Sequence, residues 1–537
     1  MLKSSMKSLA FLFICVLLLN TVPTAQAASS VPSFPGAEGF GAQSIGGRGG
    51  KVIEITNLND SGTGSLRACV DATGARTCVF RVSGTIQTTS IITIKNPYIT
   101  IAGQSAPGQG IMLKAAPSYG KGSLAIRTHD VIIRHIRFRT GPSTDSSPER
   151  RGITVESASS TNTPYNIILD HVSISWATDD NLTLIDGVRN FTVQWSIISE
   201  ALDNSTHTEG AHSKGFAISG KMFNSSTHTE NVSVHHNLLA HNSDRNVRHA
   251  AWGIVDMVNN IVYDWDVSAI EANDGQTKVP MNIVSNYFKL PSVLSSGSVA
   301  PEVIVDDGEG NGGASIYVFG NIGPHRSSDS LSQDLIVYSA SRSYIVPTKF
   351  STPAITTSTA SQAYANVLAQ AGARLPYFDT VDQRIINEVQ NATGRIIDDP
   401  SDVGGWPVIQ SVIVDNDADN DGMDDPWEIS SFGNTSRGSS TNSSVDFDSD
   451  GYTDLEEFLN GTNPKVAGGT TNPTLTPTSV PAQVPGDANG DGHVTMIDLS
   501  TLLSHFGRTG TRTFGDFDGN GTVNMSDLSV LLANFGR

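Results

Sequence analysis

Two apolar runs in the middle of the chain are followed by residues that could do chemistry. Ile167–Trp176 and Phe191–Ile198 alternate apolar and polar residues, which is the period of half-buried β-strands. Asp179 and Asp180 follow the first run, and Lys214 lies beyond the second. Acidic side chains at strand ends can share a hard cation through oxygen ligands, and a lysine can pair with an anionic substrate. The alternative is ordinary turn chemistry for the Asp-Asp-Asn sequence.

The elements that must position these residues repeat along the chain. β-Branched runs recur from Val52 to about residue 321 with almost no helical pattern between them. In the later runs an asparagine follows each centre, at Asn237, Asn260, Asn286 and Asn321, with spacings of 23, 26 and 35 residues. Periods of this size predict a solenoid, an all-β parallel β-helix in which stacked asparagines hydrogen-bond from coil to coil. A β-sandwich is the alternative, but the tight-hairpin signals that it prefers are sparse here.

The first 27 residues have the pattern of a secretory signal peptide. Lys3 and Lys7 precede the apolar run Leu9–Leu19, and small residues from Ala25 to Ala27 offer a cleavage site. The run is short for a membrane span, and no other candidate run is present. We therefore expect a secreted, extracellular protein with no membrane span.

Of the three cysteines, Cys15 lies in the signal peptide, and Cys69 and Cys78 remain as an even pair. In an oxidising compartment such a pair predicts a local disulfide. A zinc site is the weaker alternative, because two thiols without a nearby histidine or further cysteine do not complete its coordination.

The 537 residues, 38% of them apolar, can bury a large core, and the length allows two to four domains.

Charge is distributed unevenly over the chain. From Ser401 onward the sequence has 20 acidic and 5 basic residues, which accounts for −15 of the net charge of −19. An acidic chain gives no support for nucleic-acid binding, so we expect no nucleic-acid partner.

Two twelve-residue acidic loops follow the first predicted helix, Ala360–Ala373. Both carry oxygen ligands at positions one, three, five and nine, glycine at six and glutamate at twelve, the EF-hand pattern of calcium-binding loops. An acidic disordered spacer is the alternative. The predicted Ca²⁺ ligands are Asp417, Asp419, Asp421, Asp425 and Glu428 in the first loop and Asp446, Asp448, Asp450, Asp454 and Glu457 in the second.

A second loop pair lies beyond a Pro/Thr-rich linker at residues 466–485. Each of these loops is followed by a short amphipathic helix, and aspartate replaces glutamate at position twelve. The duplicated loop and helix over residues 486–537 resembles a dockerin, a calcium-folded module that docks on a cohesin domain, so a cohesin-bearing scaffold protein is the implied partner. The ligands expected from this pattern are Asp487, Asn489, Asp491, Asp498, Asp516, Asp518, Asn520 and Asp527.

Nine short motifs, in order, give the large domain a family resemblance. They are GAEGFGAQSIGGRGG, TNLNDSGTGSLR, IAGQSAPGQG, ILDHVSISWATDDN, HSKGFAIS, HHN, DRNVRH, VNNIVYDW and GGWP. Together they span residues 36–407 and look like the pectate lyases of polysaccharide lyase family 1. The resemblance implies a right-handed parallel β-helix that cleaves α-1,4-linked polygalacturonate by calcium-assisted β-elimination. Polygalacturonate or pectin would then be the substrate.

The resemblance also implies roles for particular residues. Arg245 matches the family's catalytic arginine, which acts as the base, and Lys214 matches the lysine that contacts the substrate carboxylate. Asp179, with Asp180 beside it, falls at the family's calcium-binding acid. Arg248 is a further expected substrate contact.

Three positions depart from the pattern of many relatives. Thr183 stands where a second acid is common, Arg151 where another acid is expected, and Ala250 where a further arginine is found. We therefore expect a calcium site with fewer protein ligands, which would use Asp180, Glu200 or the substrate itself.

These patterns predict five segments: a signal peptide at 1–27, a β-helix domain at 28–410, an EF-hand-like region at 411–465, a linker at 466–485 and a dockerin-like domain at 486–537. Three alternative functions remain open. A pectin lyase would prefer methylated substrate, a β-helix glycoside hydrolase would give saturated products through paired carboxylates, and a non-catalytic pectin-binding protein would not shorten the polymer.

Overall fold

The structure is a computed structural model that describes residues 31–144, 150–159, 161–220, 228–273, 279–294, 299–306, 313–468, 486, 494–507, 517 and 522–536. The predicted signal peptide and most of the predicted linker lie outside these ranges. Six predicted ligands of the dockerin-like loops also lie outside them, namely Asp487, Asn489, Asp491, Asp516, Asp518 and Asn520. Within the described ranges, no helix combines the length and the apolar composition needed to cross a membrane.

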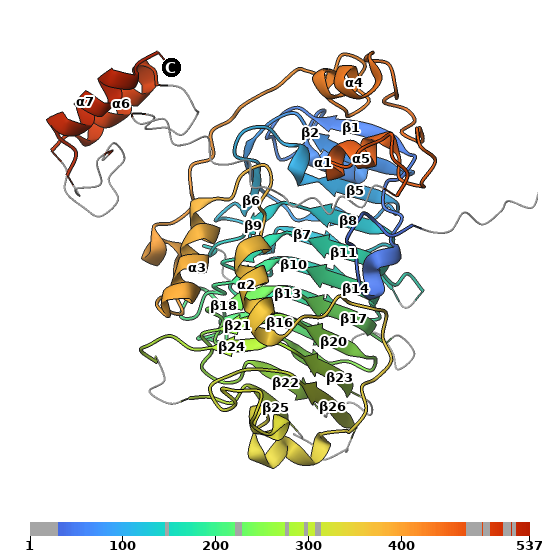
Figure 1. Cartoon of the computed structure of the whole chain (residues 1–537), viewed down its shortest axis with the longest axis vertical. Helices are drawn as coiled ribbons and strands as arrows, with labels where there is room; N and C mark the ends of the chain where they lie inside the picture. The colour runs from blue at the N-terminus through green and yellow to red at the C-terminus, as the bar shows by residue number, and fades with distance from the viewer. Residues whose placement is uncertain are drawn as a thin grey trace, which may run out of the picture. The chain divides into compact units, whose positions relative to one another are not determined.

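Three parallel sheets form the large domain (Figure 1). The first contains, in spatial order, β1 (Lys51–Ile55), β2 (Arg76–Phe80), β5 (Ile99–Ala102), β8 (Val131–Arg134), β11 (Tyr165–Asp170), β14 (Arg189–Gln194), β17 (Glu230–His235), β20 (Val255–Val258), β23 (Val279–Val284) and β26 (Ala314–Phe319). The second contains β25 (Val303–Asp306), β22 (Ile270–Asn273), β19 (Arg248–Ala250), β16 (Lys214–Ser219), β13 (Asp180–Ile185), β10 (Ile153–Glu156), β7 (Leu124–Ile126) and β4 (Ile92–Ile94). The third contains β24 (Tyr287–Lys289), β21 (Ile261–Tyr263), β18 (Leu238–Ala240), β15 (Ile197–Ser199), β12 (Ser173–Ser175), β9 (Arg137–Arg139), β6 (Ile111–Ala115) and β3 (Gly84–Thr88).

The chain visits the three sheets in turn. It passes through β11, β12 and β13 before it returns to β14, which pairs in parallel with β11. Each coil therefore stacks on the coil before it, and the predicted parallel β-helix is confirmed. Aliphatic side chains that point inward from successive coils form one continuous buried core.

Several runs that look like single strands in the sequence are pairs of strands joined at a bend. His135, His171, Trp195 and His236 each have a φ between 49° and 56° and separate a strand of the first sheet from a strand of the third. Left-handed backbone is uncommon for residues with a Cβ. A histidine or tryptophan at such a corner gives no glycine-like signal, so the sequence pattern merged the two strands.

The predicted asparagine ladder begins just after the His236 corner and continues at the matching corners of the next three coils. The Nδ2 of Asn237 donates to Oδ1 of Asn260, Asn260 donates to Asn286, and Asn286 donates to Asn321, each over 3.0 Å. All four residues are fully buried. Because a buried amide is costly without partners, the ladder holds the coils in register.

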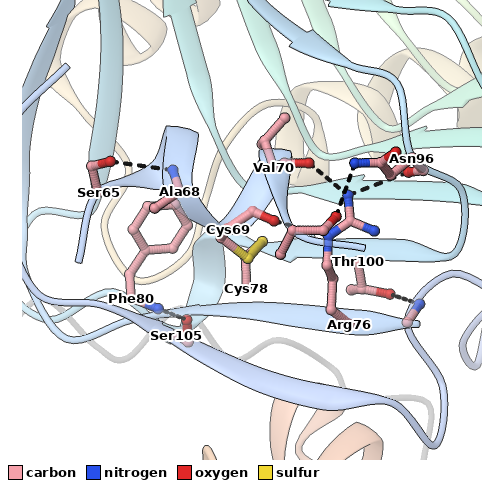
Figure 2. The surroundings of a disulfide bond; sticks show 12 residues. Ser65, Ala68, Cys69, Val70, Arg76, Cys78, Phe80, Asn96, Thr100 and Ser105 are labelled. Atoms are coloured by element: carbon pink, nitrogen blue, oxygen red, sulfur yellow. Dashed lines mark hydrogen bonds between the residues drawn. A yellow bond between two sulfur atoms is a disulfide. The ribbon is translucent and has the colours of Figure 1, made fainter. Parts of the chain in front are cut away.

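A disulfide closes the first coil, as predicted. Cys69 on α1 (Leu66–Asp71) is joined to Cys78 on β2 (Figure 2). The buried guanidinium of Arg76 lies beside it and donates to the carbonyls of Cys69, Val70 and Asn96. The bond and this arginine together fix α1 against the end of the solenoid.

Two longer helices pack on the third sheet. The predicted helix is α2 (Ala360–Gln370), which begins with a Thr359 capping box. The helix α3 (Thr380–Asn391) was not predicted, although Asp379 caps it and its apolar residues have helical spacing. Both helices bury apolar residues against Trp176 and the strands β15, β18 and β21.

Shorter helices complete the described chain. The 3-10 helices are η1 (Phe40–Gln43), η2 (Gly103–Ser105), η3 (Gln333–Ile336), η4 (Ser339–Tyr344) and η5 (Pro400–Val403). In the C-terminal part the α-helices are α4 (Asp425–Phe432), α5 (Asp454–Asn460), α6 (Met496–His505) and α7 (Met525–Asn534). The last two helices share a small core of Val494, Leu502, Val523 and Leu531.

Candidate functional site

Neighbouring coils bring the predicted site residues into one row. Asp180 at the start of β13 lies opposite Lys214 at the start of β16, and Lys214 lies opposite Asp244 in the next coil. In the preceding coil Ile153 pairs with Leu182, so Arg151 lies opposite Asp180. The row therefore alternates positive and negative charge from coil to coil.

Asp180 binds the arginine expected to be catalytic. Arg245 Nη1 lies 3.0 Å from Asp180 Oδ1, and the hydroxyl of Thr183 donates to Asp180 Oδ2 over 3.1 Å. Lys214 Nζ lies 3.0 Å from Asp244 Oδ2. Lys214 and Arg245 keep 17% and 22% of their side chains exposed, so a polymer on the surface can reach both.

Asp179 has a different pair of partners. Arg151 Nη2 lies 2.8 Å from Asp179 Oδ2, and His212 Nε2 lies 3.2 Å from Asp179 Oδ1. Arg151 also reaches toward the second acid, with Nε 4.0 Å from Asp180 Oδ2. All four carboxylate oxygens of the acid pair therefore have protein partners.

These contacts change the acidities in the row. Burial alone would raise the pKa of Asp179, but His212 and Arg151 outweigh burial and lower the pKa to about 2. Burial and the charge of Asp179 raise the pKa of Asp180. Burial alone would lower the pKa of Arg245, yet Asp180 outweighs it and raises the pKa. The two acids and the two arginines beside them, Arg151 and Arg245, together carry no net charge.

Arg245 has two features of a functional residue. Its backbone is left-handed, with a φ of 55°. Its Nε is buried and has no hydrogen-bond partner among the described residues. This donor points to a ligand that the guanidinium can still bind.

The remaining predicted contact lies one coil further. Arg248 on β19 pairs with Glu271 on β22, with Nε 2.8 Å from Oε1, and keeps 30% of its side chain exposed. It therefore borders the row without touching the acid pair.

Glu200, one of three alternatives expected to complete the calcium site, has partners outside the acid pair. This carboxylate is fully buried and accepts hydrogen bonds from Trp176 Nε1 and Arg384 Nη2, over 2.9 and 2.8 Å. The sequence could not show this, because Arg384 belongs to α3, 184 residues away. The residue that the sequence reasoning missed is His212, which lies only two positions before Lys214.

The two EF-hand-like loops form separate acidic groups. Asp417, Asp419 and Asp421 place carboxylate oxygens within 4.8 Å of one another, and Asp446, Asp448 and Asp450 do the same. In the second loop pair, Asp498 and Asp527 are buried and accept from the backbone N–H groups of Thr495 and Asn524.

A large cavity lies apart from the charged row. It has a volume of about 880 Å³ and is lined by His135, Asp170, His171 and Trp195 among others. None of the site residues named above lines it, so size alone does not locate the chemistry.

Comparisons with known proteins identify relatives of both parts of the chain. A family model described as Dockerin type I domain matches residues 485–535, which confirms the dockerin-like module. A protein named "Probable pectate lyase C" from Neosartorya fischeri is 34% identical over 457 residues, covering 84% of this chain and 98% of the relative. The protein of the same name from Emericella nidulans is 33% identical over 460 residues, covering 83% of this chain and 97% of the relative.

Similar solved structures include a pectate lyase and a pollen allergen. The pectate lyase Bsp165PelA from Bacillus sp. N165, solved with trigalacturonate, has a TM-score of 0.41 and 18% identity, covering 62% of this chain and 98% of that chain. The cedar pollen allergen jun a 1 has a TM-score of 0.43 and 16% identity, covering 63% of this chain and 92% of that chain.

Proposed function

This chain belongs to the pectate lyase family and is a polysaccharide lyase, and we propose that it cleaves α-1,4-linked polygalacturonate by β-elimination. The observation that carries the proposal is the meeting of Arg245, Lys214 and the acid pair Asp179–Asp180 on successive coils. In such a reaction a base takes the C5 proton, the C4–O bond breaks, and its electrons leave with the departing sugar oxygen. The product carries a double bond between C4 and C5.

Arg245 is the proposed base. A neutral guanidine is needed to accept a proton, and the contact with Asp180 raises the pKa of Arg245 and keeps it charged. Proton transfer therefore requires that the Arg245–Asp180 pair opens when substrate binds. The same opening would free the buried, unpartnered Nε of Arg245 to donate to substrate.

Lys214 and Arg248 are proposed substrate contacts. Both have partly exposed side chains on adjacent strands, β16 and β19. A uronate carboxylate beside Lys214 would be partly neutralised, which makes the neighbouring C5 proton more acidic and stabilises the developing enolate. Arg248 would hold a further uronate by a forked hydrogen bond.

Ca²⁺ is the proposed cofactor of this site. Asp179 and Asp180 have the oxygen ligands that Ca²⁺ prefers, and both carboxylates are buried side by side. The ion would supply positive charge that neutralises the uronate carboxylate and the enolate. Because all four oxygens already have protein partners, we expect Ca²⁺ to bind here only when uronate groups complete the ligand set.

The test is an ultraviolet product assay on polygalacturonate, with and without a chelator. The C4–C5 double bond next to the carboxylate absorbs, so absorbance must rise as the polymer shortens. Shortening without absorbance would show a glycoside hydrolase, and binding without shortening would show a pectin-binding protein. Faster cleavage of highly methylated pectin, unaffected by chelator, would make the enzyme a pectin lyase.

The dockerin type I match supports a proposal about location and partner. We expect residues 486–537 to fold on Ca²⁺ and to bind a cohesin-bearing scaffold protein outside the cell. The signal-peptide pattern of residues 1–27 agrees with export. Binding of the full chain to an immobilised cohesin domain, lost on chelation, would support this partner.

A further inference from the structure

The EF-hand-like region covers an open sheet edge. Among the described strands, β1 is the end strand of its sheet and has β2 as its one neighbour. On its other side the Val52 N–H donates to the carbonyl of Ser440 over 2.9 Å, and the Ser443 N–H donates to the carbonyl of Gly50 over 2.9 Å. An uncovered edge invites pairing with other chains, so this region protects the first coil.

A second backbone contact lies at the end of β2. Val82 forms an antiparallel bridge with Ile413. The Ser83 N–H donates to Val412 and the Val414 N–H donates to Arg81, over 2.9 and 3.0 Å. The chain therefore enters the first acidic loop directly from a short strand pairing on the solenoid.

One buried arginine ties the first loop to the solenoid. Arg81 follows β2 and pairs with three carboxylates: Glu54 at 2.5 Å, Asp424 at 2.7 Å, and Asp417. Asp417 occupies position one of the first loop. The residue that would begin a calcium site is thus already anchored to the β-helix.

Apolar packing joins both loops to the same surface. Met423 and Leu455 are buried against Val52 on β1 and Val79 on β2. Gly422 has a φ of 94°, and a Cβ there would meet Val52 Cγ1 at 2.9 Å. Glycine at loop position six therefore allows both the turn and the close approach to β1.

Several loop carboxylates are buried without partners. Asp421 Oδ2, Glu428 Oε2 and Glu457 Oε2 have no hydrogen-bond partner among the described residues, and their side chains are at most 2% exposed. Unpaired buried carboxylates are costly, and a cation removes that cost.

We propose that the loops at 417–428 and 446–457 each bind Ca²⁺ and that the two ions lock residues 412–460 onto β1 and β2 as a cap of the β-helix. Glu428 and Glu457 supply the position-twelve ligand, and the ions hold the loops in the shape that packs Met423 and Leu455. Calcium would thus stabilise the β-helix domain from its end. This role is separate from any Ca²⁺ at Asp179 and Asp180 and does not depend on the proposed reaction.

Thermal unfolding of the full chain with Ca²⁺ and with chelator tests the proposal. We expect Ca²⁺ to raise the midpoint of the main transition by several degrees in the wild type and in D498N/D527N, which alters position twelve of the dockerin-like loops. The double variant E428Q/E457Q should lose this shift. A shift that persists in E428Q/E457Q, or that disappears in D498N/D527N, would overturn the proposal.

A second measurement needs no variant. Backbone hydrogen exchange of β1 in the wild-type full chain should become faster on chelation, because the Val52 and Ser443 hydrogen bonds would open with the cap. Exchange at β1 that is the same with and without Ca²⁺ would contradict the cap, even if the glutamine variants do not fold.

Discussion

The acid pair Asp179–Asp180 in the charged row and the acids of the EF-hand-like loops differ in what surrounds them. Every oxygen of Asp179 and Asp180 has a protein partner, with Arg151 and Arg245 supplying two positive charges. In the loops, Glu428 and Glu457 are equally buried, yet each has an oxygen without a partner. Arginines balance the charge of Asp179 and Asp180, whereas the described residues offer no cationic partner to the free oxygens of Glu428 and Glu457.

This difference shows that the number of acids does not by itself predict a calcium site. A bound ion must compensate for the partners that it displaces. At Asp179 and Asp180 it would displace Arg151 and Arg245. At Glu428 and Glu457 the loops would give up no such contact, while Asp417 at position one is held by Arg81. We therefore propose that the loops bind Ca²⁺ tightly and that Asp179 and Asp180 bind it only together with substrate.

The largest expected effect separates chemistry from stability. R245K keeps the positive charge but loses the planar fork, so we expect turnover to fall by about 10²–10⁴-fold while substrate binding changes little. The rise in unfolding midpoint that Ca²⁺ causes should be the same in this variant as in the wild type. Steady-state absorbance assays and thermal unfolding measure both. Appreciable turnover in R245K would mean that another residue is the base.

The next effect concerns the cap. R81Q leaves Asp417 and Glu54 without their shared buried guanidinium, and we expect a loss of about 3 kcal/mol in the free energy of unfolding. The matched control is R127Q, because Arg127 forms a more exposed pair with Glu156. That control should cost less than about 1 kcal/mol. Equal losses in denaturant titrations of the two variants would contradict the role of Arg81.

Making the surroundings of Asp179 more like those of the loop acids should give a smaller effect. R151D removes the arginine from Asp179 and adds the acid that the family resemblance led us to expect, so the Ca²⁺ concentration for half-maximal lyase activity should fall about tenfold. R127D makes the same change of charge away from the acid pair and should leave that concentration unaltered. An R151D enzyme with the wild-type calcium requirement would show that Arg151 does not compete with the ion.

The smallest effect is a difference in pH dependence. Glu457 has a folded pKa raised from 4.5 to about 8, so without Ca²⁺ its contribution to stability is lost as pH rises through that range. Asp179 has a lowered pKa, so its contribution is present above 3.8 and is lost as pH falls toward 2. In chelator, we expect the unfolding midpoint of the wild type minus that of E428Q/E457Q to fall as the pH rises from 5 to 8. A rising difference would contradict the assignment.

Much of the fold could be predicted because its signals are local. The spacing of Asn237, Asn260, Asn286 and Asn321 reports the length of one coil, and the ladder follows from it. The bends at His135 and similar corners were missed, because left-handed backbone at a histidine has no sequence signature.

The site was predicted in part for the same reason. Arg245 and Lys214 stand in motifs, but their partners come from other coils. Arg151 reaches Asp179 only through the register of β10 on β13, and Arg81 meets Asp417 across 336 residues. Contacts of that kind depend on how the coils stack, which residue patterns do not encode locally.

We propose that the EF-hand-like loops, and not Asp179 and Asp180, bind Ca²⁺ in the absence of substrate. The direct measurement is the number of Ca²⁺ ions bound per full chain by equilibrium dialysis, without polygalacturonate. We predict that E428Q/E457Q binds two ions fewer than the wild type and that D179N/D180N binds the same number. An unchanged number in E428Q/E457Q together with a loss in D179N/D180N would contradict the account.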